Sequence, residues 1–281
     1  MGLQHHIFID HTNLLPQVAP PVMAFITLGK NYIHYNILQQ DTKEQLFVKT
    51  LYTSDGNIGQ DEFDNLLSDT LLRKASSVHL AIDTAKQLLI PTALLSAHNH
   101  AIYFNHLYEI EKEEEIKTQQ VSQEITELYV VKKASVSYLT NEFKQLKIYS
   151  HSACLLHTYF SVINQLKKSS VVFLHSAHDS FHISYFKNNE LLYTQSFGYK
   201  TPADILYCVL NTLQWQQAAI PDVAVYLTGF SLQQQAIVDI LTQYMEIDTL
   251  QSAHFANISF DIQHFPIPIL FNQFSLISCV L

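Results

Sequence analysis

An approximate internal repeat constrains the fold of this chain more than any other feature of its sequence. Residues 24–38 run from one predicted strand through a turn at Gly29–Asn31 into a second strand, and residues 172–186 repeat this pattern 148 positions later. In both copies a third strand and then a helix follow, which is typical of β-β-β-α units. The period is too long for one unit of a solenoid. We therefore predict two structurally related α/β domains.

The boundary between these domains is expected near Tyr149–Ser152, which gives domains at 1–150 and 151–281. The first domain holds an acidic insert near 105–127, which contains Glu109, Glu111, Glu113, Glu114 and Glu115 and is expected to be an exposed helix or loop. The apolar C-terminal tail is expected to form a strand or helix that returns to the first domain.

Other expected elements follow from local patterns. The first copy contains strands at 22–28, 32–39 and 45–51 and a helix at 62–74, and the second contains strands at 170–174, 182–186 and 191–197 and a helix from Thr201 to about Trp215. Residues 1–20 are expected to be irregular. A strand is expected at 135–139, and helices at 153–167 and 232–244.

Composition excludes several classes of protein. Hydrophobic residues make up 48% of the chain, which excludes a disordered protein. The formal net charge is −9 and no basic patch accompanies it, so nucleic acid is not an expected partner. No membrane-spanning stretch and no secretory signal are seen, and the three cysteines lie in apolar surroundings, as small buried thiols do in a reducing cytosol. The expected location is the cytoplasm.

Phosphate-binding loops are disfavoured, because only 6 of the 281 residues are Gly. The P-loop, the Gly-x-Gly-x-x-Gly fingerprint and the Gly-x-Ser-x-Gly nucleophile motif are all absent. The densest group of possible metal ligands consists of His175, His178, Asp179 and His182, of which the three histidines would form the site. Turn and surface histidines are the favoured interpretation of that group, so no metal site and no catalytic residue is predicted.

Two β-β-β-α domains in tandem resemble the superfamily of actin, sugar kinases and heat-shock chaperone ATPases. The chain looks most like its bacterial branch of pilus-assembly and cell-division actin relatives, and is similar to an uncharacterised bacterial family with that fold. The resemblance implies two ribonuclease H-like domains, each with a mixed sheet and packed helices, and a cleft between them.

The superfamily's nucleotide motifs are altered here. The first Asp-x-Gly motif corresponds to Thr27-Leu28-Gly29, followed by Lys30, and the second corresponds to His175-Ser176-Ala177. The adenosine motif, a strand that ends in two glycines, keeps only Gly229 before Phe230. Mg²⁺ prefers hard oxygen ligands, which neutral Thr27 and His175 do not replace.

The resemblance therefore implies a degenerate nucleotide cleft. Its residues would be Thr27, Gly29, Lys30, His175, Ala177 and Gly229. We expect a non-catalytic scaffold or regulatory protein that has no cofactor and binds a protein partner. The alternative is an atypical ATP-binding protein or ATPase that uses Mg²⁺, in which Asp10, Asp83, Asp179 or Asp222 supplies the missing acids.

Overall fold

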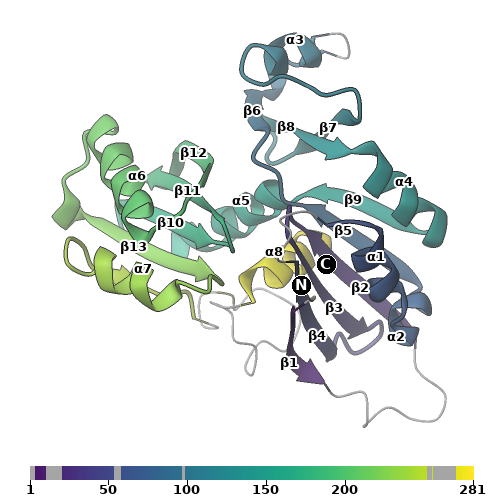
Figure 1. Ribbon diagram of the computed structural model, residues 1–281. Helices are drawn as coiled ribbons and strands as arrows, with labels where there is room; N and C mark the ends of the chain where they lie inside the picture. The colour runs from purple at the N-terminus through teal and green to yellow at the C-terminus, as the bar shows by residue number, and fades with distance from the viewer. Residues whose placement is uncertain (1–3, 11–20, 54–57, 97–98, 252–254, 256–269) are drawn as a thin grey trace. The chain divides into compact units, whose positions relative to one another are not determined.

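The computed structural model describes residues 4–10, 21–53, 58–96, 99–251, 255 and 270–281 (Figure 1). The chain divides into unit 1, residues 1–157 and 275–281, and unit 2, residues 158–274. It passes between the units inside two helices, α5 (His151–Val162) and α8 (Phe271–Val280). The boundary expected near Tyr149–Ser152 thus lies at the start of α5, whereas the division falls inside that helix.

Unit 1 is built on a six-stranded mixed sheet in the order β1-β4-β3-β2-β5-β9. Strands β1 to β4 pair antiparallel, and β5 and β9 extend the sheet from β2 in parallel. The strands are β1 (Gln4–Asp10), β2 (Val22–Leu28), β3 (Tyr32–Gln39), β4 (Gln45–Tyr52), β5 (Ser77–Ile82) and β9 (Leu146–Ser150). All of β2 is buried, as expected for a central strand of a covered sheet.

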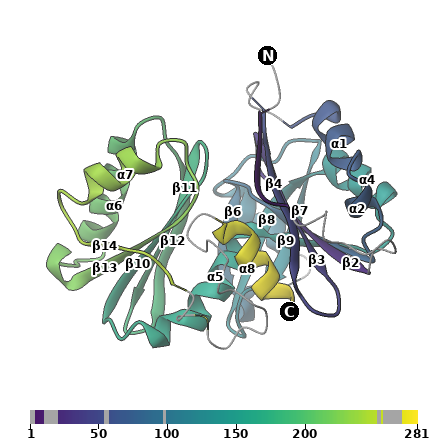
Figure 2. The same ribbon diagram turned by 90° about the horizontal axis from the view of Figure 1, so that it is seen from below.

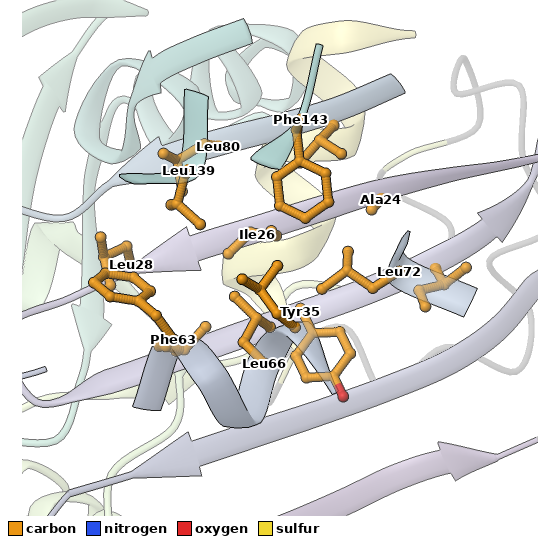
Figure 3. Packing of buried hydrophobic residues seen from close by; sticks show 14 of the residues in the cluster. Ala24, Ile26, Leu28, Tyr35, Phe63, Leu66, Leu72, Leu80, Leu139 and Phe143 are labelled. Carbon is orange, nitrogen blue, oxygen red and sulfur yellow. The ribbon is translucent and has the colours of Figure 1, made fainter. Parts of the chain in front are cut away.

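Three helices cover one face of this sheet: α1 (Gln60–Leu67), α2 (Thr70–Arg73) and α4 (Lys133–Glu142). Figure 3 shows Phe63, Leu66, Leu72 and Leu139 of these helices packed over Ile26 and its sheet neighbours. Burial of this apolar surface, at roughly 25 cal/mol per Å², is what holds the helices on the sheet.

A smaller lobe of unit 1 consists of a three-stranded antiparallel sheet in the order β6-β8-β7 with one short helix. Its elements are β6 (Gln87–Pro91), the 3-10 turn η2 (Thr92–Leu94), α3 (His100–Asn105), β7 (Glu114–Gln120) and β8 (Ile125–Lys132). Ile90, Phe104, Leu128 and Val130 form its own core. The expectation of a helix or loop for the acidic insert is wrong for residues 114–120, which form an edge strand whose exposed charges discourage further pairing.

Unit 2 has a five-stranded sheet in the order β12-β11-β10-β13-β14. Its strands are β10 (Ser170–Ser176), β11 (Ser180–Lys187), β12 (Glu190–Gly198), β13 (Val223–Gly229) and β14 (Ile247–Asp248). Helices α6 (Pro202–Trp215) and α7 (Gln234–Leu241) and the 3-10 turns η3 (Ile163–Gln165) and η4 (Ile220–Asp222) complete its described elements. The start of α6 is as predicted: the Thr201 hydroxyl and the Asp204 carboxylate form a capping box, and Pro202 stands at the first helical position.

The sheets of the two units share strand order and direction, since β12-β11-β10-β13-β14 matches β4-β3-β2-β5-β9. The hairpin registers also correspond. Thr27 pairs with His34 across β2 and β3, and His175 pairs with His182 across β10 and β11, at the 148-residue spacing of the repeat. The α/β class, with mixed sheets and packed helices in two units, is therefore as predicted.

Four further expectations need correction. Residues 135–139 lie in α4, because Val136, Leu139 and Phe143 also fit a helical period and face the sheet. The helix expected at 62–74 is interrupted, because the Asp69 side chain caps a second helix. The described part of the irregular lead-in forms β1, whereas residues 11–20 lie outside the described residues.

The last correction concerns the ends of helices. The helix expected at 153–167 ends as α5 at Val162 with η3 after it, and the helix expected at 232–244 is the shorter α7. The tail forms helix α8, whose end returns to unit 1 (Figure 2), while residues 260–269 lie outside the described residues. Of the helices that the structure describes, none is both long and apolar enough to cross a bilayer.

Candidate functional site

The carboxyl ends of three parallel strands meet at one edge of the unit 1 sheet. Strand β2 ends at Leu28, β5 at Ile82 and β9 at Ser150. In α/β sheets ligands bind outside these carboxyl ends, where loops converge and helices begin. The corresponding edge in unit 2 is formed by Ser176 of β10 and Gly229 of β13. These two edges carry all the residues expected for a nucleotide site.

The turn of the first hairpin is covered by an aromatic ring. The Gly29 amide donates to the Tyr32 carbonyl oxygen at 2.9 Å, which closes the turn. A Cβ added at Gly29 would lie 2.2 Å from Cε1 of Tyr32, so the ring lies directly against the glycine. Tyr32 is 1% exposed. Glycine is needed here to admit this ring, and the ring occupies the side of the backbone that glycine leaves open.

Thr27 and Lys30 differ in their access to solvent at this turn. Thr27, at the position of the missing acid, is fully buried beside its strand partner His34. Its hydroxyl has no hydrogen-bond partner among the described residues, and solvent does not reach it. Lys30 is exposed, and its carbonyl oxygen accepts from the Ile58 amide at 2.9 Å. The lysine therefore holds a loop through its backbone while its side chain faces water.

Asp83 follows β5 at this edge and is held by two neighbours. The Tyr32 hydroxyl donates to Asp83 Oδ2 at 2.5 Å, and His151 Nδ1 lies 3.7 Å from Asp83 Oδ1. Close by, the His34 ring lies 4.5 Å from that of Tyr32 and its Nδ1 lies 2.5 Å from Thr50 Oγ1. Burial is the main cause that lowers the pKa of His34 to about 3, with a smaller lowering by the neighbouring His151 ring and an opposing effect of Asp83. His34 is thus neutral at pH 7.

A buried carboxyl group lies at the N-terminus of α5. Glu127 of β8 is 1% exposed and accepts a short hydrogen bond from the Ser152 hydroxyl. It also accepts from Ser150 and from the Ala153 amide of the first helical turn, where the helix dipole favours negative charge. Burial nevertheless dominates and raises the pKa of Glu127 to about 7. This carboxyl group caps a helix and is sealed from solvent.

The expectation of turn and surface histidines is wrong for His175 and His182, which lie buried in the unit 2 sheet. His175 is 2% exposed, its Nδ1 lies 3.1 Å from Thr228 Oγ1, and its ring packs near Phe271. His182 places Nδ1 2.8 Å from Ser196 Oγ and Nε2 2.7 Å from Thr194 Oγ1. The two rings engage opposite neighbouring strands. Among the described residues no group of three or more His, Cys, Asp or Glu side chains is arranged to hold a metal ion.

Gly229 is also needed for internal packing. Its φ is +86°, a conformation that side chains rarely adopt, and an added Cβ would lie 2.1 Å from the Ser176 carbonyl oxygen. The Ser176 hydroxyl lies 3.2 Å from the Thr228 carbonyl oxygen and 2.8 Å from Gln234 Oε1. Gly229 thus lets β13 leave the sheet directly beside β10.

Hydrogen bonds of the Tyr199 hydroxyl hold the second hairpin turn in place. This hydroxyl lies 3.0 Å from the Ala177 carbonyl oxygen and 3.2 Å from that of His178, and it hydrogen-bonds to Ser231 after β13. The Ala177 amide donates to the Ser180 carbonyl oxygen at 2.8 Å. This hydrogen bond uses the Ala177 amide within the turn itself.

Only two of the four acids considered as substitutes lie at these edges. Asp83 borders the first turn and Asp179 lies in the second. Asp10 pairs with Phe47, toward the opposite end of the unit 1 strands, and Asp222 precedes β13 at the amino end of that strand. Taken unit by unit, the described acids at these turns do not provide the paired carboxylates that hold Mg²⁺ in a nucleotide site.

Sequence reasoning found the turns but missed the residues that occupy them. Tyr32, Tyr199 and Glu127 were not singled out. An aromatic residue three positions after the turn glycine, and an acid inside the apolar strand that contains Glu127, were the available signals. The contacts that they make join residues 22 to 51 positions apart, which a local pattern does not reveal.

Comparisons with known proteins agree with this architecture. A family model described as "Protein of unknown function (DUF3822)" matches residues 24–247. A Bacteroides thetaiotaomicron protein with an actin-like ATPase fold and unknown function superposes with a TM-score of 0.73 at 16% identity, covering 91% of this chain and 96% of that one. The PilM–PilN type IV pilus biogenesis complex contains a chain that matches with a TM-score of 0.62 at 9% identity, covering 94% and 99%. No protein of curated function matches the sequence.

Proposed function

The chain belongs to the DUF3822 family and has an actin-like ATPase fold, and we propose that it is a non-catalytic member of that fold which acts in the cytoplasm by binding a protein partner. The observation that carries the proposal is the closed first turn, where the Tyr32 ring covers Gly29. Phosphoryl transfer needs carboxylate-bound Mg²⁺ and backbone that can approach the phosphates. The shared strand order of the two sheets supports descent from a duplicated unit whose nucleotide motifs have since changed.

Nucleotide binding is tested by titrating the purified protein with Mg-ATP, Mg-ADP and a non-hydrolysable analogue while its thermal midpoint is measured. We expect no saturable rise in the midpoint and no phosphate release, because a ligand stabilises only a native state that binds it. The variant Y32A serves as a comparison, since it removes the ring from Gly29. Saturable stabilisation of the unmodified protein at sub-millimolar ATP would overturn the proposal and favour an atypical ATP-binding protein that uses Asp83.

The lobe of unit 1 is the surface that best fits a partner. Leu94, Ile102 and Leu107 are 56%, 60% and 62% exposed, which is unusual for large apolar side chains. The acids that follow α3 are also exposed: Glu109, Glu111, Glu113 and Glu115. Figure 1 shows α3 at the outer end of this lobe. Apolar side chains beside acidic ones fit a partner segment that carries both apolar and basic residues. The resemblance to PilM, which is found in complex with PilN, supports a protein partner.

This surface is tested by comparing proteins retained from cell extract by the unmodified chain and by two variants. The first, I102S/L107S/E111K, alters the lobe. The matched control, Y207S/W215S, removes side chains of α6 that are 69% and 80% exposed. We expect a specific partner to be lost with the lobe variant, kept with the control and weakened by salt. A partner equally retained by the lobe variant would exclude this surface.

A further inference from the structure

Two cysteines that are 125 positions apart in the sequence meet within unit 1. Cys154 lies in the first turns of α5 and Cys279 near the end of α8, and the Cys154 thiol donates a hydrogen bond to the Cys279 sulfur. Neither cysteine forms a disulfide in this structure. The third cysteine, Cys208, lies on α6 of unit 2. The large separation of Cys154 and Cys279 in the sequence gives no indication that their side chains are in contact.

One side-chain amide orients the two sulfurs. Gln119 Nε2 lies 3.9 Å from Cys279 Sγ, and the same side chain hydrogen-bonds to Cys154. Gln119 is itself fixed, because its Oε1 accepts from the Ser150 amide at 2.6 Å. The thiols are thus held in contact by β7, α5 and α8 together.

The two thiols differ in access and in acidity. Cys154 is fully buried, and burial together with the nearby Glu127 carboxyl group raises the pKa of its thiol. Cys279 is partly exposed, and the hydrogen bond from Cys154 lowers the pKa of its thiol against the opposing effect of burial. Tyr149 also borders both sulfurs. Such a pair has one thiol that an oxidant can reach and one that can resolve the product.

We propose that Cys154 and Cys279 form a reversible disulfide, with a small disulfide of the glutathione type as oxidant. The Cys279 thiolate attacks one glutathione sulfur, the glutathione S–S bond breaks, and glutathione thiolate leaves. The Cys154 sulfur then attacks the Cys279 sulfur, giving its proton to the departing second glutathione. The two cysteines lose two electrons in all, and glutathione disulfide is reduced to two molecules of glutathione.

This disulfide would fasten the C-terminal helix to the start of α5. The chain passes between the two units only inside these two helices. Closing a loop of this size restricts the unfolded chain, so the oxidised protein should be the more stable form. The modification is independent of the proposed partner surface and of any nucleotide.

The experiment treats the native full-length protein with glutathione disulfide, blocks remaining thiols, and maps the peptides by mass spectrometry without reduction. We expect a Cys154–Cys279 peptide pair, a higher thermal midpoint, and reversal of both by dithiothreitol. The variant C208S should behave identically, whereas C279S should lose both effects. A stable glutathione adduct on Cys279 without the pair, pairing between molecules, or two unmodified thiols would each overturn the proposal. Because these outcomes are read on the unmodified protein, misfolding of C279S would not affect the test.

Discussion

At the scale of single residues, Gly29 illustrates how a position can be identified correctly for an incomplete reason. The alignment of the repeat selected it as a relic of a phosphate motif. In the structure the residue is needed because the Tyr32 ring lies against it. The turn was predictable because glycine and its neighbours mark turns locally. The ring was not, because its placement depends on the hydrogen bond to Asp83, 51 positions away.

The substitution G29A should lower the free energy of unfolding by roughly 1–3 kcal/mol, because the new methyl group would overlap a buried ring. Urea denaturation measures this change. G198A is the matched control, since its Cβ would meet nothing closer than 3.8 Å and should change stability little. In the background of Y32A the cost of G29A should largely vanish, and equal costs in both backgrounds would show that the ring is not the cause.

Glu127 makes stability depend on pH in a defined direction. Burial raises the pKa of Glu127 to about 7 in the folded chain, above the ordinary value of 4.5, so the folded state binds more protons between these two pH values. The contribution of Glu127 to the free energy of unfolding is complete below pH 4.5 and is lost as pH rises toward 7. The free energy of unfolding changes with pH by at most about 1.4 kcal/mol per pH unit for this one group. Urea denaturation between pH 4.5 and 7 should show that the free energy of unfolding of the unmodified protein, relative to that of E127Q, falls as pH rises.

The comparison with E127Q separates Glu127 from the histidines. His34 and His79, whose pKa values are lowered to about 3 and about 4, make stability rise with pH between these values and 6.5. They are present in both proteins and therefore cancel in the difference. Parallel pH profiles for the two proteins would contradict a protonated, buried Glu127.

At the scale of elements, the interruption between α1 and α2 depends on one carboxylate. Asp69 Oδ1 accepts from the Leu71 and Leu72 amides at 2.9 and 3.2 Å, and Oδ2 accepts from the Tyr35 hydroxyl at 3.0 Å. D69A should cost about 1–2 kcal/mol of stability in thermal or urea unfolding, as the loss of a helix cap does. D69N keeps an acceptor and should recover most of the loss. Equal effects of the two substitutions would assign the cost to charge instead of capping.

Which elements could be predicted depended on how far their signals are local. Helix α6 was predictable because its start is marked within four residues by Thr201, Pro202 and Asp204. Helix α4 was mistaken for a strand because Val136, Tyr138 and their neighbours also alternate. Its helical face, with Leu139 buried, is decided by packing on the sheet of unit 1. Strand β7 was missed because its hydrogen bonds to β8 outweigh a sequence rich in exposed charge.

At the scale of the whole molecule, each unit has its own hydrophobic core. Leu80 belongs to the core of unit 1 and Val225 to that of unit 2, and both are fully buried. L80A should cost about 2–5 kcal/mol and speed amide exchange in β2 and β5 while β10 and β13 stay protected. Hydrogen exchange read by mass spectrometry checks this, and V225A should give the reverse pattern. Faster exchange throughout the chain in both variants would show that the units unfold together.

The two-unit architecture was predictable from the repeat because strand order follows from the spacing of strands and turns. The candidate site was predictable only in outline. Topology brings the ends of β2, β5 and β9 to one edge, so the place was foreseeable. The side chains at this edge were not predictable, because Tyr32, His151 and Glu127 reach it from elements far apart in the sequence.

The contact between Gly29 and Tyr32 also bears on how sequences of relatives should be interpreted. If the ring is what demands the glycine, the two positions should vary together: glycine with an aromatic residue three positions later, and larger residues at the first position only where the second is small. Invariance of this glycine across a family alignment would then record a packing constraint. Counted as evidence of an active ATPase, it would assign enzymatic activity to proteins in which the glycine is needed only to admit a neighbouring ring.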